Sequence, residues 1–340
     1  MLKKWALVLA SALTLVLAAC SSNGANSSAN GSMSGDGVGS PVTLGLTFIP
    51  NVQFAPAYVA QTDGIFSSAG LDVTLRHHGS DEGLFTALAS GQEDVVIASG
   101  DEVLPARQAG VDLVSIGAFY HSYPVTIIVP ANSGISSFED LKGKKIGIPG
   151  EYGSSWYGLL AGLQAHHMTT DDISVVSIGY TQQAALAAGQ VDAVVGFSNN
   201  DLVMDQQAGL DVSTIELTPA DTPLVSAAIV TTHTWLAAHP QEATALVQSI
   251  TAASSRVIAN PQHALEVTQK YDHTLSDAHS LATAREVLKR TITLLTQDGK
   301  ATGVQDLEKW KQMAAFQRQI PDVLNTDADV DAAVTNDYAQ

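Results

Sequence analysis

The chain is poor in cysteine, in basic residues and in long apolar runs. Its 340 residues include a single cysteine, Cys20, so no disulfide can form within one chain, and neither Cys-based catalysis nor a Cys-rich metal site is expected. Lys and Arg number 16 against 34 Asp and Glu, a formal net charge of −18 at pH 7. So acidic a chain is a poor partner for nucleic acid or an anionic lipid surface. Beyond the first twenty residues, no stretch is long and apolar enough for a transmembrane helix.

The start of the chain has the pattern of a targeting segment. Two lysines precede the apolar stretch 5–16, and the tetrapeptide LAAC at 17–20 is followed by two serines. This arrangement resembles the bacterial lipoprotein signal, in which the chain is cut before the cysteine and its thiol receives lipid. Residues 21–41 are mostly Ser, Gly and Asn and are predicted to be a flexible tether. We therefore expect a protein held by lipid on Cys20 at the extracytoplasmic face of the cell membrane.

Strand-like and helix-like segments alternate through the body of the chain, whose length predicts two domains. Such alternation indicates an α/β fold with largely parallel sheets. After the last predicted strand the sequence is almost entirely helical. Strands are expected at 42–49, 71–75, 95–98, 114–119, 145–148, 175–178, 193–195 and 224–230, and helices at 54–61, 83–90, 101–109, 240–259, 262–271, 281–296 and 304–319.

One supersecondary unit occurs twice. ALASGQED at 87–94 and ALAAGQVD at 185–192 align without a gap, and each precedes an apolar strand. We expect one copy in each of two lobes, with lobe 1 formed by residues 42–128 and 225–335 and lobe 2 by residues 129–224. The chain then crosses between the lobes twice. Because ligands of open α/β sheets bind beyond the carboxyl ends of the strands, two facing lobes predict a ligand cleft between them.

Two stretches carry a family resemblance: IPNVQFAPAYVAQTDGIFSSAGLDVTL at 49–75 and FEDLKGKKIGIPG at 138–150. Together with the lipoprotein-like start, they resemble the solute-binding lipoproteins of ABC importers, in the branch of NMT1/THI5-like and SsuA-like proteins. The resemblance covers nearly the whole chain after the signal. It implies the type II periplasmic-binding fold, an ABC permease as partner and no cofactor, and we expect a monomer.

The resemblance defines the ligand only broadly. Members of this branch bind thiamine-type pyrimidines, riboflavin, alkanesulfonates or nitrate, and eukaryotic relatives are pyrimidine-forming enzymes. Pyrimidine binders typically carry a His shortly after Pro-Asn, where this chain has Val52, Gln53 and Phe54. The form IPNVQFAP is closer to the riboflavin-uptake members.

The stretch GIPGEYGSSWYG at 147–158 joins a predicted strand to a helix and combines glycines with a carboxylate and three rings. The amino end of a helix attracts anions through its free N–H groups and dipole. Carboxylates at such turns disfavour an anionic ligand and suit the N–H donors of an aminopyrimidine or a flavin imide. Glu151, Asp101 and Glu102 are candidates, and Asp81 and Glu82 lie at a comparable turn. For Asp81 and Asp101, helix capping is an equal alternative.

Aromatic and amide side chains complete the predicted site. Tyr152 and Trp156 are predicted ligand contacts, because flat heteroaromatic ligands stack on rings. Core packing is the favoured interpretation of Tyr157 and Phe119. Polar residues that follow predicted strands can supply the few convergent groups that a pocket needs. The predicted ligand-binding residues are Asn51, Gln53, Phe54, Ser99, Asp101, Glu102, Tyr123, Glu151, Tyr152, Ser154, Trp156, Tyr180, Asn199 and Asn200.

Several motifs resemble metal-binding or catalytic motifs but lack part of the required pattern. The His pairs at 77–78 and 166–167 are adjacent, so their side chains diverge and no metal site is expected. GEYGSSWYG lacks the G-x-S-x-G of hydrolases, and the lack of a second cysteine disfavours a pyrimidine-forming enzyme. The sequence predicts a non-enzymatic receptor for a flat heteroaromatic vitamin or precursor, riboflavin or a thiamine-type pyrimidine. The alternative is the same receptor for a sulfonate, nitrate or other small anion.

Overall fold

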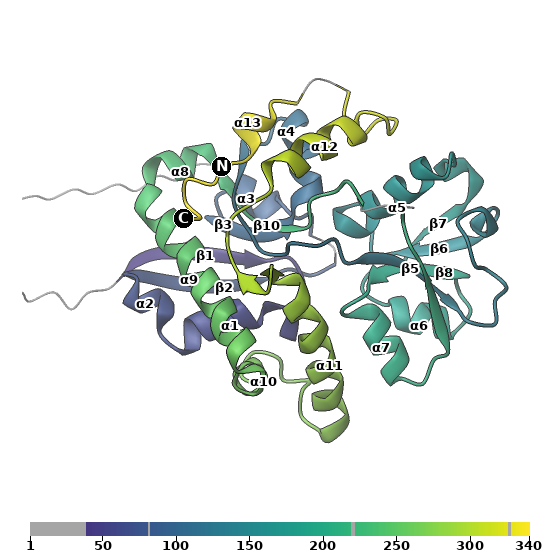
Figure 1. Cartoon of the computed structure of the whole chain (residues 1–340), viewed down its shortest axis with the longest axis horizontal. Helices are drawn as coiled ribbons and strands as arrows, with labels where there is room; N and C mark the ends of the chain where they lie inside the picture. The colour runs from purple at the N-terminus through teal and green to yellow at the C-terminus, as the bar shows by residue number, and fades with distance from the viewer. Residues whose placement is uncertain (1–38, 81, 219–221, 326–327) are drawn as a thin grey trace, which may run out of the picture. The chain divides into compact units, whose positions relative to one another are not determined.

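The computed structural model describes residues 39–80, 82–218, 222–325 and 328–340. The predicted signal segment, Cys20, most of the predicted tether and Asp81 lie outside the described residues. Two five-stranded sheets, each flanked by helices, form the framework of the described chain (Figure 1). Their strand orders are β2-β1-β3-β10-β4 and β7-β6-β8-β5-β9. This mixed α/β architecture with two sheets is the predicted type II periplasmic-binding fold.

The first sheet is built from two separate segments of the chain, one that contains β1 to β4 and a later one that contains β10. Strand β1 pairs in parallel with β2 and β3, whereas β10 lies antiparallel between β3 and β4. Apolar residues alternate or run continuously along these strands, as expected for a sheet that is covered by helices. The strands are β1 (Ser40–Leu46), β2 (Leu71–His77), β3 (Val95–Ser99), β4 (Leu113–Ala118) and β10 (Ala227–Thr232), and the helices between them are α1 (Ala55–Thr62), α2 (Ile65–Ser68), α3 (Thr86–Ala89) and α4 (Val103–Gln108).

The second sheet repeats this plan within one continuous segment. Strand β6 pairs in parallel with β7 and β8, and β5 lies antiparallel between β8 and β9. Because β5 belongs to this sheet, the chain enters lobe 2 before Val125, and the boundary predicted at 129 falls inside a strand. The elements are β5 (Val125–Pro130), β6 (Lys145–Ile148), α5 (Gly153–Ala165), β7 (Ser174–Ser177), α6 (Gln182–Ala187), β8 (Ala193–Phe197), α7 (Asp201–Gln207) and β9 (Val212–Ile215).

The twice-used sequence unit has the same local structure in both sheets. Asp94 Oδ2 accepts a hydrogen bond from the Thr43 backbone N–H at 2.8 Å. Asp192 Oδ2 accepts one from the Lys145 backbone N–H, also at 2.8 Å. In each copy the aspartate therefore joins the start of one strand, β3 or β8, to its parallel neighbour, β1 or β6, which confirms the predicted internal repeat.

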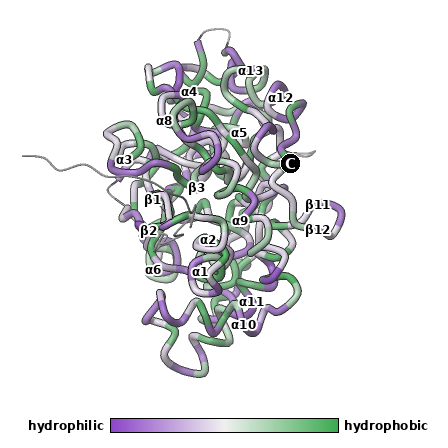
Figure 2. The backbone as a smooth tube through the Cα atoms, turned by 90° about the vertical axis from the view of Figure 1, so that its left-hand side faces the viewer, coloured by the Kyte–Doolittle hydropathy of each residue, from purple (hydrophilic) through white to green (hydrophobic). Residues whose placement is uncertain are grey.

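Helices dominate the chain after β10, as predicted. Leu246, Val247 and Ile250 of the longest helix are buried against the first sheet and α1. Figure 2 shows hydrophobic and hydrophilic stretches alternating along the backbone. A short hairpin turns at Asp298-Gly299, where both residues have positive φ, 51° and 75°. The elements are α8 (His233–Ala238), α9 (Pro240–Ala259), α10 (Pro261–Thr268), α11 (Ala278–Leu294), β11 (Thr296–Gln297), β12 (Lys300–Ala301), α12 (Leu307–Gln317) and α13 (Val330–Ala333).

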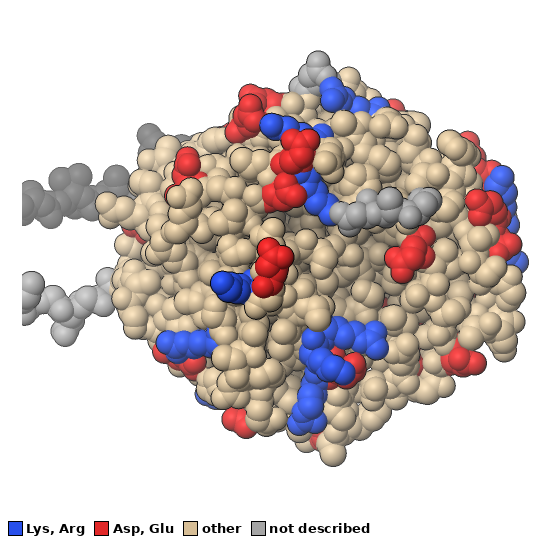
Figure 3. Space-filling view, in the orientation of Figure 1, with Lys and Arg blue, Asp and Glu red and all other residues tan. Residues whose placement is uncertain are grey.

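Among the described residues, no helix combines the length and the apolar character needed to cross a bilayer. Charged side chains are sparse on the face shown in Figure 3, where the Lys and Arg groups lie beside Asp and Glu. The chain passes from the first sheet to the second between β4 and β5 and returns to the first between β9 and β10.

Candidate functional site

A cavity lies where the carboxyl ends of strands from the two sheets face each other. It holds about 840 Å³ of space free of atoms, open solvent at its mouth included. Thr47 and Phe48 follow β1, Ser99 ends β3, and Pro149 follows β6. The ends of parallel strands thus form the cavity wall, as ligand sites of open α/β sheets require.

Aromatic rings line much of the cavity. Phe48 of lobe 1 and Tyr180 of lobe 2 meet edge to face, with ring centroids 4.5 Å apart and planes at 62°. Edge-to-face pairs are favourable because the positive ring edge faces a negative ring face. The rings in the wall are Phe48, Phe54, Phe119, Tyr120, Tyr152, Tyr180 and Phe197. Phe119, for which core packing was favoured, therefore also reaches the cavity.

The polar part of the wall is almost uncharged. None of the described lining residues is Lys, Arg or His, and Asp201 is the one carboxylate among them. Asp201 Oδ2 accepts from the Phe197 backbone N–H at 2.7 Å, and burial raises the pKa of Asp201 to about 6. The neutral hydrogen-bonding groups are the side chains of Thr47, Gln53, Ser99, Tyr120, Tyr152, Ser154, Ser155, Tyr180, Gln182 and Asn200.

Two amide pairs join the lobes beside the cavity. Asn51 Nδ2 donates to Asn200 Oδ1 at 3.2 Å, and Asn199 Nδ2 donates to Gln53 Oε1 at 2.9 Å. Asn51 also caps the short helical turn at Val52–Phe54 by accepting from the Gln53 backbone N–H. The predicted amides thus contact one another across the cleft, and Gln53 and Asn200 also line the cavity.

The start of α5 is held by oxygen atoms of lobe 1. Glu102 Oε2 accepts from the Gly153 backbone N–H at 2.5 Å, and Ser99 Oγ accepts from the Ser154 backbone N–H at 3.0 Å. Gly153 has φ +65°, a conformation that strains any other residue. The glycine in GEYGSS therefore turns the chain so that the first amides of α5 face β3 and the turn after it.

Asp101 lies behind the cavity wall. Its side chain is fully buried, and Oδ2 accepts from the Tyr123 hydroxyl at 2.6 Å. Tyr123 Oη is also 2.9 Å from the Ser154 carbonyl oxygen. Burial raises the pKa of Asp101 to about 7 and that of Glu102 to about 7. Both carboxyls therefore connect lobe 1 to the start of α5 and do not line the cavity.

The structure places two of the predicted ligand contacts, Glu151 and Trp156, outside the cavity wall. The Glu151 side chain is exposed and outside the cavity wall. Trp156, a residue of α5, is half-buried, and its ring packs against apolar clusters of both lobes. On α5, Ser154 and Ser155 line the cavity and Trp156 does not, whereas Glu151 precedes the helix and its side chain is exposed.

The structure brings only part of the predicted set to the cavity. Gln53, Phe54, Ser99, Tyr152, Ser154, Tyr180 and Asn200 line it. Asn51, Asp101, Glu102, Tyr123, Glu151, Trp156 and Asn199 do not. The sequence reasoning missed Thr47, Phe48, Ser155, Gln182 and Asp201. Asp201 closely follows a parallel strand, so the rule used for the amides was a sufficient signal for it. Thr47 and Phe48 were missed because the first strand was predicted to run to residue 49, whereas β1 ends at Leu46.

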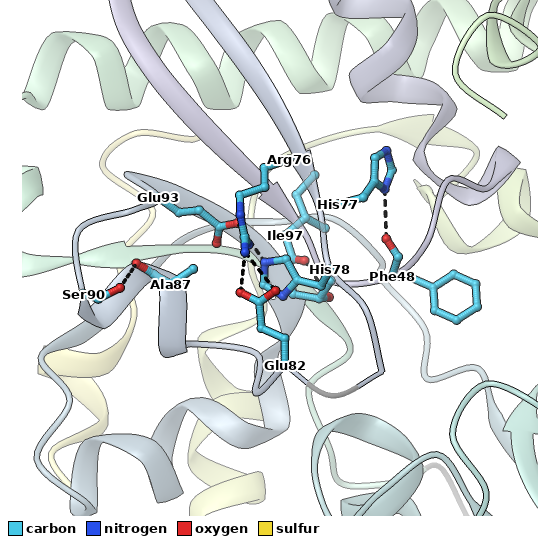
Figure 4. A network of polar contacts seen from close by, with 10 residues as sticks. Phe48, Arg76, His77, His78, Glu82, Ala87, Ser90, Glu93 and Ile97 are labelled. Atoms are coloured by element: carbon cyan, nitrogen blue, oxygen red, sulfur yellow. Dashed lines mark hydrogen bonds and ion pairs between the residues drawn. The ribbon is translucent and has the colours of Figure 1, made fainter.

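An ion-pair network supports the wall from lobe 1 (Figure 4). Arg76 contacts Glu93 at 2.7 Å and Glu82 at 2.8 Å, and buried His78 Nε2 lies 2.8 Å from Glu93 Oε1. Glu82 is thus paired with Arg76 and does not line the cavity. Between His78 and Glu82 the chain presents the Ser80 carbonyl, which accepts from the Tyr152 hydroxyl of lobe 2 at 2.6 Å.

Comparison with known proteins assigns the chain to a family. Residues 51–264 match the family described as NMT1/THI5 like. The chain is 30% identical to the riboflavin-binding protein RibY of Chloroflexus aurantiacus, over 87% of this chain and 85% of that protein. It is 24% identical to the 4-amino-5-hydroxymethyl-2-methylpyrimidine phosphate synthase of Aspergillus parasiticus, over 86% of each chain.

Solved structures agree on the fold. The alkanesulfonate-binding protein SsuA of Xanthomonas axonopodis pv. citri, bound to MOPS, superposes with a TM-score of 0.67 at 19% identity. The superposition covers 87% of this chain and 98% of SsuA.

Proposed function

Because the chain belongs to the NMT1/THI5-like family, we propose that it is a solute-binding receptor, not an enzyme, and that it serves an ABC importer. In this proposal Cys20 carries a lipid anchor, the receptor faces the outside of the membrane as a monomer, and an ABC permease accepts the solute. The solute is a flat heteroaromatic vitamin or precursor, riboflavin or a thiamine-type pyrimidine. Lobe closure on the solute requires no cofactor.

One observation carries the choice of ligand: the cavity wall combines aromatic rings with neutral hydrogen-bonding groups and has no cationic side chain among its described residues. Stacking contributes about 0.5–1.5 kcal/mol per aromatic pair beyond burial. The amide groups of Gln53, Gln182 and Asn200 can donate to the ring nitrogens and carbonyls of a heterocycle and accept from its N–H groups. The hydroxyl groups in the same wall can do both as well. A planar, uncharged heterocycle fits both properties, and the name of the riboflavin-binding relative supports the same class.

A small anion is the second candidate, favoured by the fold that the chain shares with the MOPS-bound SsuA. Sulfonates and phosphates are usually bound by Arg, Lys or free helix N-termini. Here the first amides of α5 already donate to Glu102 and Ser99, which weighs against an anion.

Catalysis is the third candidate, because one relative is named as a pyrimidine phosphate synthase. An enzyme would change its ligand chemically, whereas a receptor releases it intact. Mass spectrometry of the bound compound before and after incubation separates these two outcomes.

The decisive experiment is titration of the purified protein with riboflavin, an aminopyrimidine and MOPS. Riboflavin binding is read from the quenching of its own fluorescence, and the other two ligands are measured by calorimetry. We expect saturable binding of one heterocycle and none of MOPS. Saturable binding of MOPS alone would replace the heterocycle by the anion as the ligand.

A further inference from the structure

Glu102 holds a position that an anionic ligand could otherwise use. It lies directly after the turn that ends β3, and its Oε2 accepts from the first backbone N–H of α5 at 2.5 Å. α5 has 13 residues, long enough for its dipole to favour negative charge at this end. The side chain of lobe 1 therefore supplies the negative charge that the amino end of a lobe 2 helix attracts.

This contact is part of the cavity boundary. Gly153 and Ser154, whose amides open α5, line the cavity, and so does Ser99, which accepts from Ser154. A sulfonate or phosphate in the cavity would meet the same helix end. The amides of Gly153 and Ser154 already have acceptors, so such a ligand gains no hydrogen bond from either of them and meets a helix end that already holds a carboxylate.

The charges nearby reinforce this effect. Asp101 is buried next to Glu102, and its Oδ1 has no hydrogen-bond partner among the described residues. On the opposite lobe Asp201 lines the cavity, where the wall has no cation among its described residues to offset it. When ionised, Glu102 beside the wall and Asp201 in it each oppose a second negative charge in the cavity.

We propose that Glu102 is a specificity-determining residue, which occupies the amino end of α5 in place of a ligand and so excludes sulfonates and phosphate esters from the cavity. This inference rests on the proposed function, since it assumes that the cavity binds a solute. It predicts a receptor that distinguishes a free heterocycle from its phosphorylated form.

The test compares the full chain with three variants: Glu102→Ala, Glu102→Gln and Glu151→Gln. The Ala variant removes the charge and frees the Gly153 amide, whereas the Gln variant removes the charge and keeps an acceptor. Glu151→Gln removes an equal charge near the same helix from an exposed side chain outside the cavity, so it is the matched control. The probes are MOPS, inorganic phosphate, riboflavin and riboflavin 5′-phosphate. Each is titrated by calorimetry at pH 8, where Glu102 is ionised, at low and high salt.

We expect Glu102→Ala to bind MOPS and phosphate at least about tenfold more tightly than the wild type, equal to about 1.4 kcal/mol. Glu102→Gln should show a smaller gain and Glu151→Gln none. The gain should shrink at high salt, because it arises from charge.

The inference is overturned if both Glu102 variants melt cooperatively yet bind MOPS and phosphate no better than the wild type. It is also overturned if Glu151→Gln produces the same gain, since the effect would then come from the net charge of the protein and not from the position of Glu102. If the Ala variant does not fold, the Gln variant decides. Failure of the wild type to bind any heterocycle contradicts the proposed function instead, while the anion comparison between variants still decides the role of Glu102.

Discussion

Phe48 and Tyr180 meet across the cavity with their ring centroids 4.5 Å apart, one ring from each lobe. A planar solute that enters this space contacts both rings, so each lobe contributes part of the stacking surface. Such a contact couples ligand binding to the approach of the lobes, since neither ring alone encloses the solute.

Replacing Tyr180 should therefore weaken binding. We expect Tyr180→Ala to raise the Kd for the heterocyclic ligand by roughly tenfold, because one aromatic contact of about 0.5–1.5 kcal/mol is lost. Tyr180→Phe keeps the ring and should stay within about threefold of the wild type. Calorimetric titration measures both, and an unchanged Kd in the Ala variant would remove Tyr180 from the binding surface.

Trp156 should behave as a packing residue. The sequence pattern predicted a ligand contact, but the ring packs against apolar clusters of both lobes. We expect Trp156→Ala to lower the free energy of unfolding by about 2–4 kcal/mol, at the lower end for large aromatic truncations because the ring is only half-buried. The Kd of the ligand should change less than about threefold. Denaturant titration and calorimetry test the two effects separately, and a large loss of affinity with normal stability would return Trp156 to the cavity.

The buried Glu93 should be important for stability. It contacts both Arg76 and His78, so Glu93→Ala leaves the buried His78 without its carboxylate and Arg76 with Glu82 alone, at a cost of about 3–5 kcal/mol. Glu82→Ala removes the outer, half-exposed partner of the same arginine and should cost less than about 1 kcal/mol. Urea unfolding of the two variants provides the comparison. Equal losses in both would show that burial of Glu93 has no special weight.

The acid pair beside α5 predicts a pH effect. Burial raises the pKa of Asp101 and of Glu102 to about 7, above the values near 4 of an unfolded chain. Between these pKa values the folded state binds more protons, so the two groups stabilise the fold fully below pH 4 and lose this contribution as the pH rises to 7. The groups facing them are the Tyr123 and Tyr157 hydroxyls and the Gly153 amide.

The measurement is the melting temperature at a series of pH values. The difference in stability between wild type and Glu102→Gln should change in favour of the variant as the pH rises from 4 to 7, and should level off above 7. Asp140→Asn is the control, because serine hydrogen bonds lower the pKa of this exposed carboxyl. A difference that is constant across this range would contradict the pKa assigned to Glu102.

The fold was largely predictable because its signals are local. The repeated unit was visible as two aligned octapeptides, and the asparagine, glutamine and serine positions after strands follow from the direction of parallel strands. Strand β5 was missed as part of lobe 2 because its apolar run follows closely on β4, and nothing local says which sheet it joins. The direction of Trp156 was not predictable because one helical step rotates a side chain by about 100°, and the phase of α5 depends on where Gly153 turns the chain. Glu151 precedes this turn, so its direction depends on the same glycine.

The antiparallel β10 has a consequence for the order of folding. It lies between β3 and β4, although more than half of the described chain precedes β10 and is synthesised before it. Lobe 2 consists of one continuous segment, so its sheet can assemble during synthesis as soon as β9 has emerged from the ribosome. Lobe 1 must instead wait, with β4 unpaired in its sheet, until β10 inserts beside it. We expect the newly made protein to pass through a state in which the second lobe is formed and the first has an open gap, which chaperones or export factors can recognise.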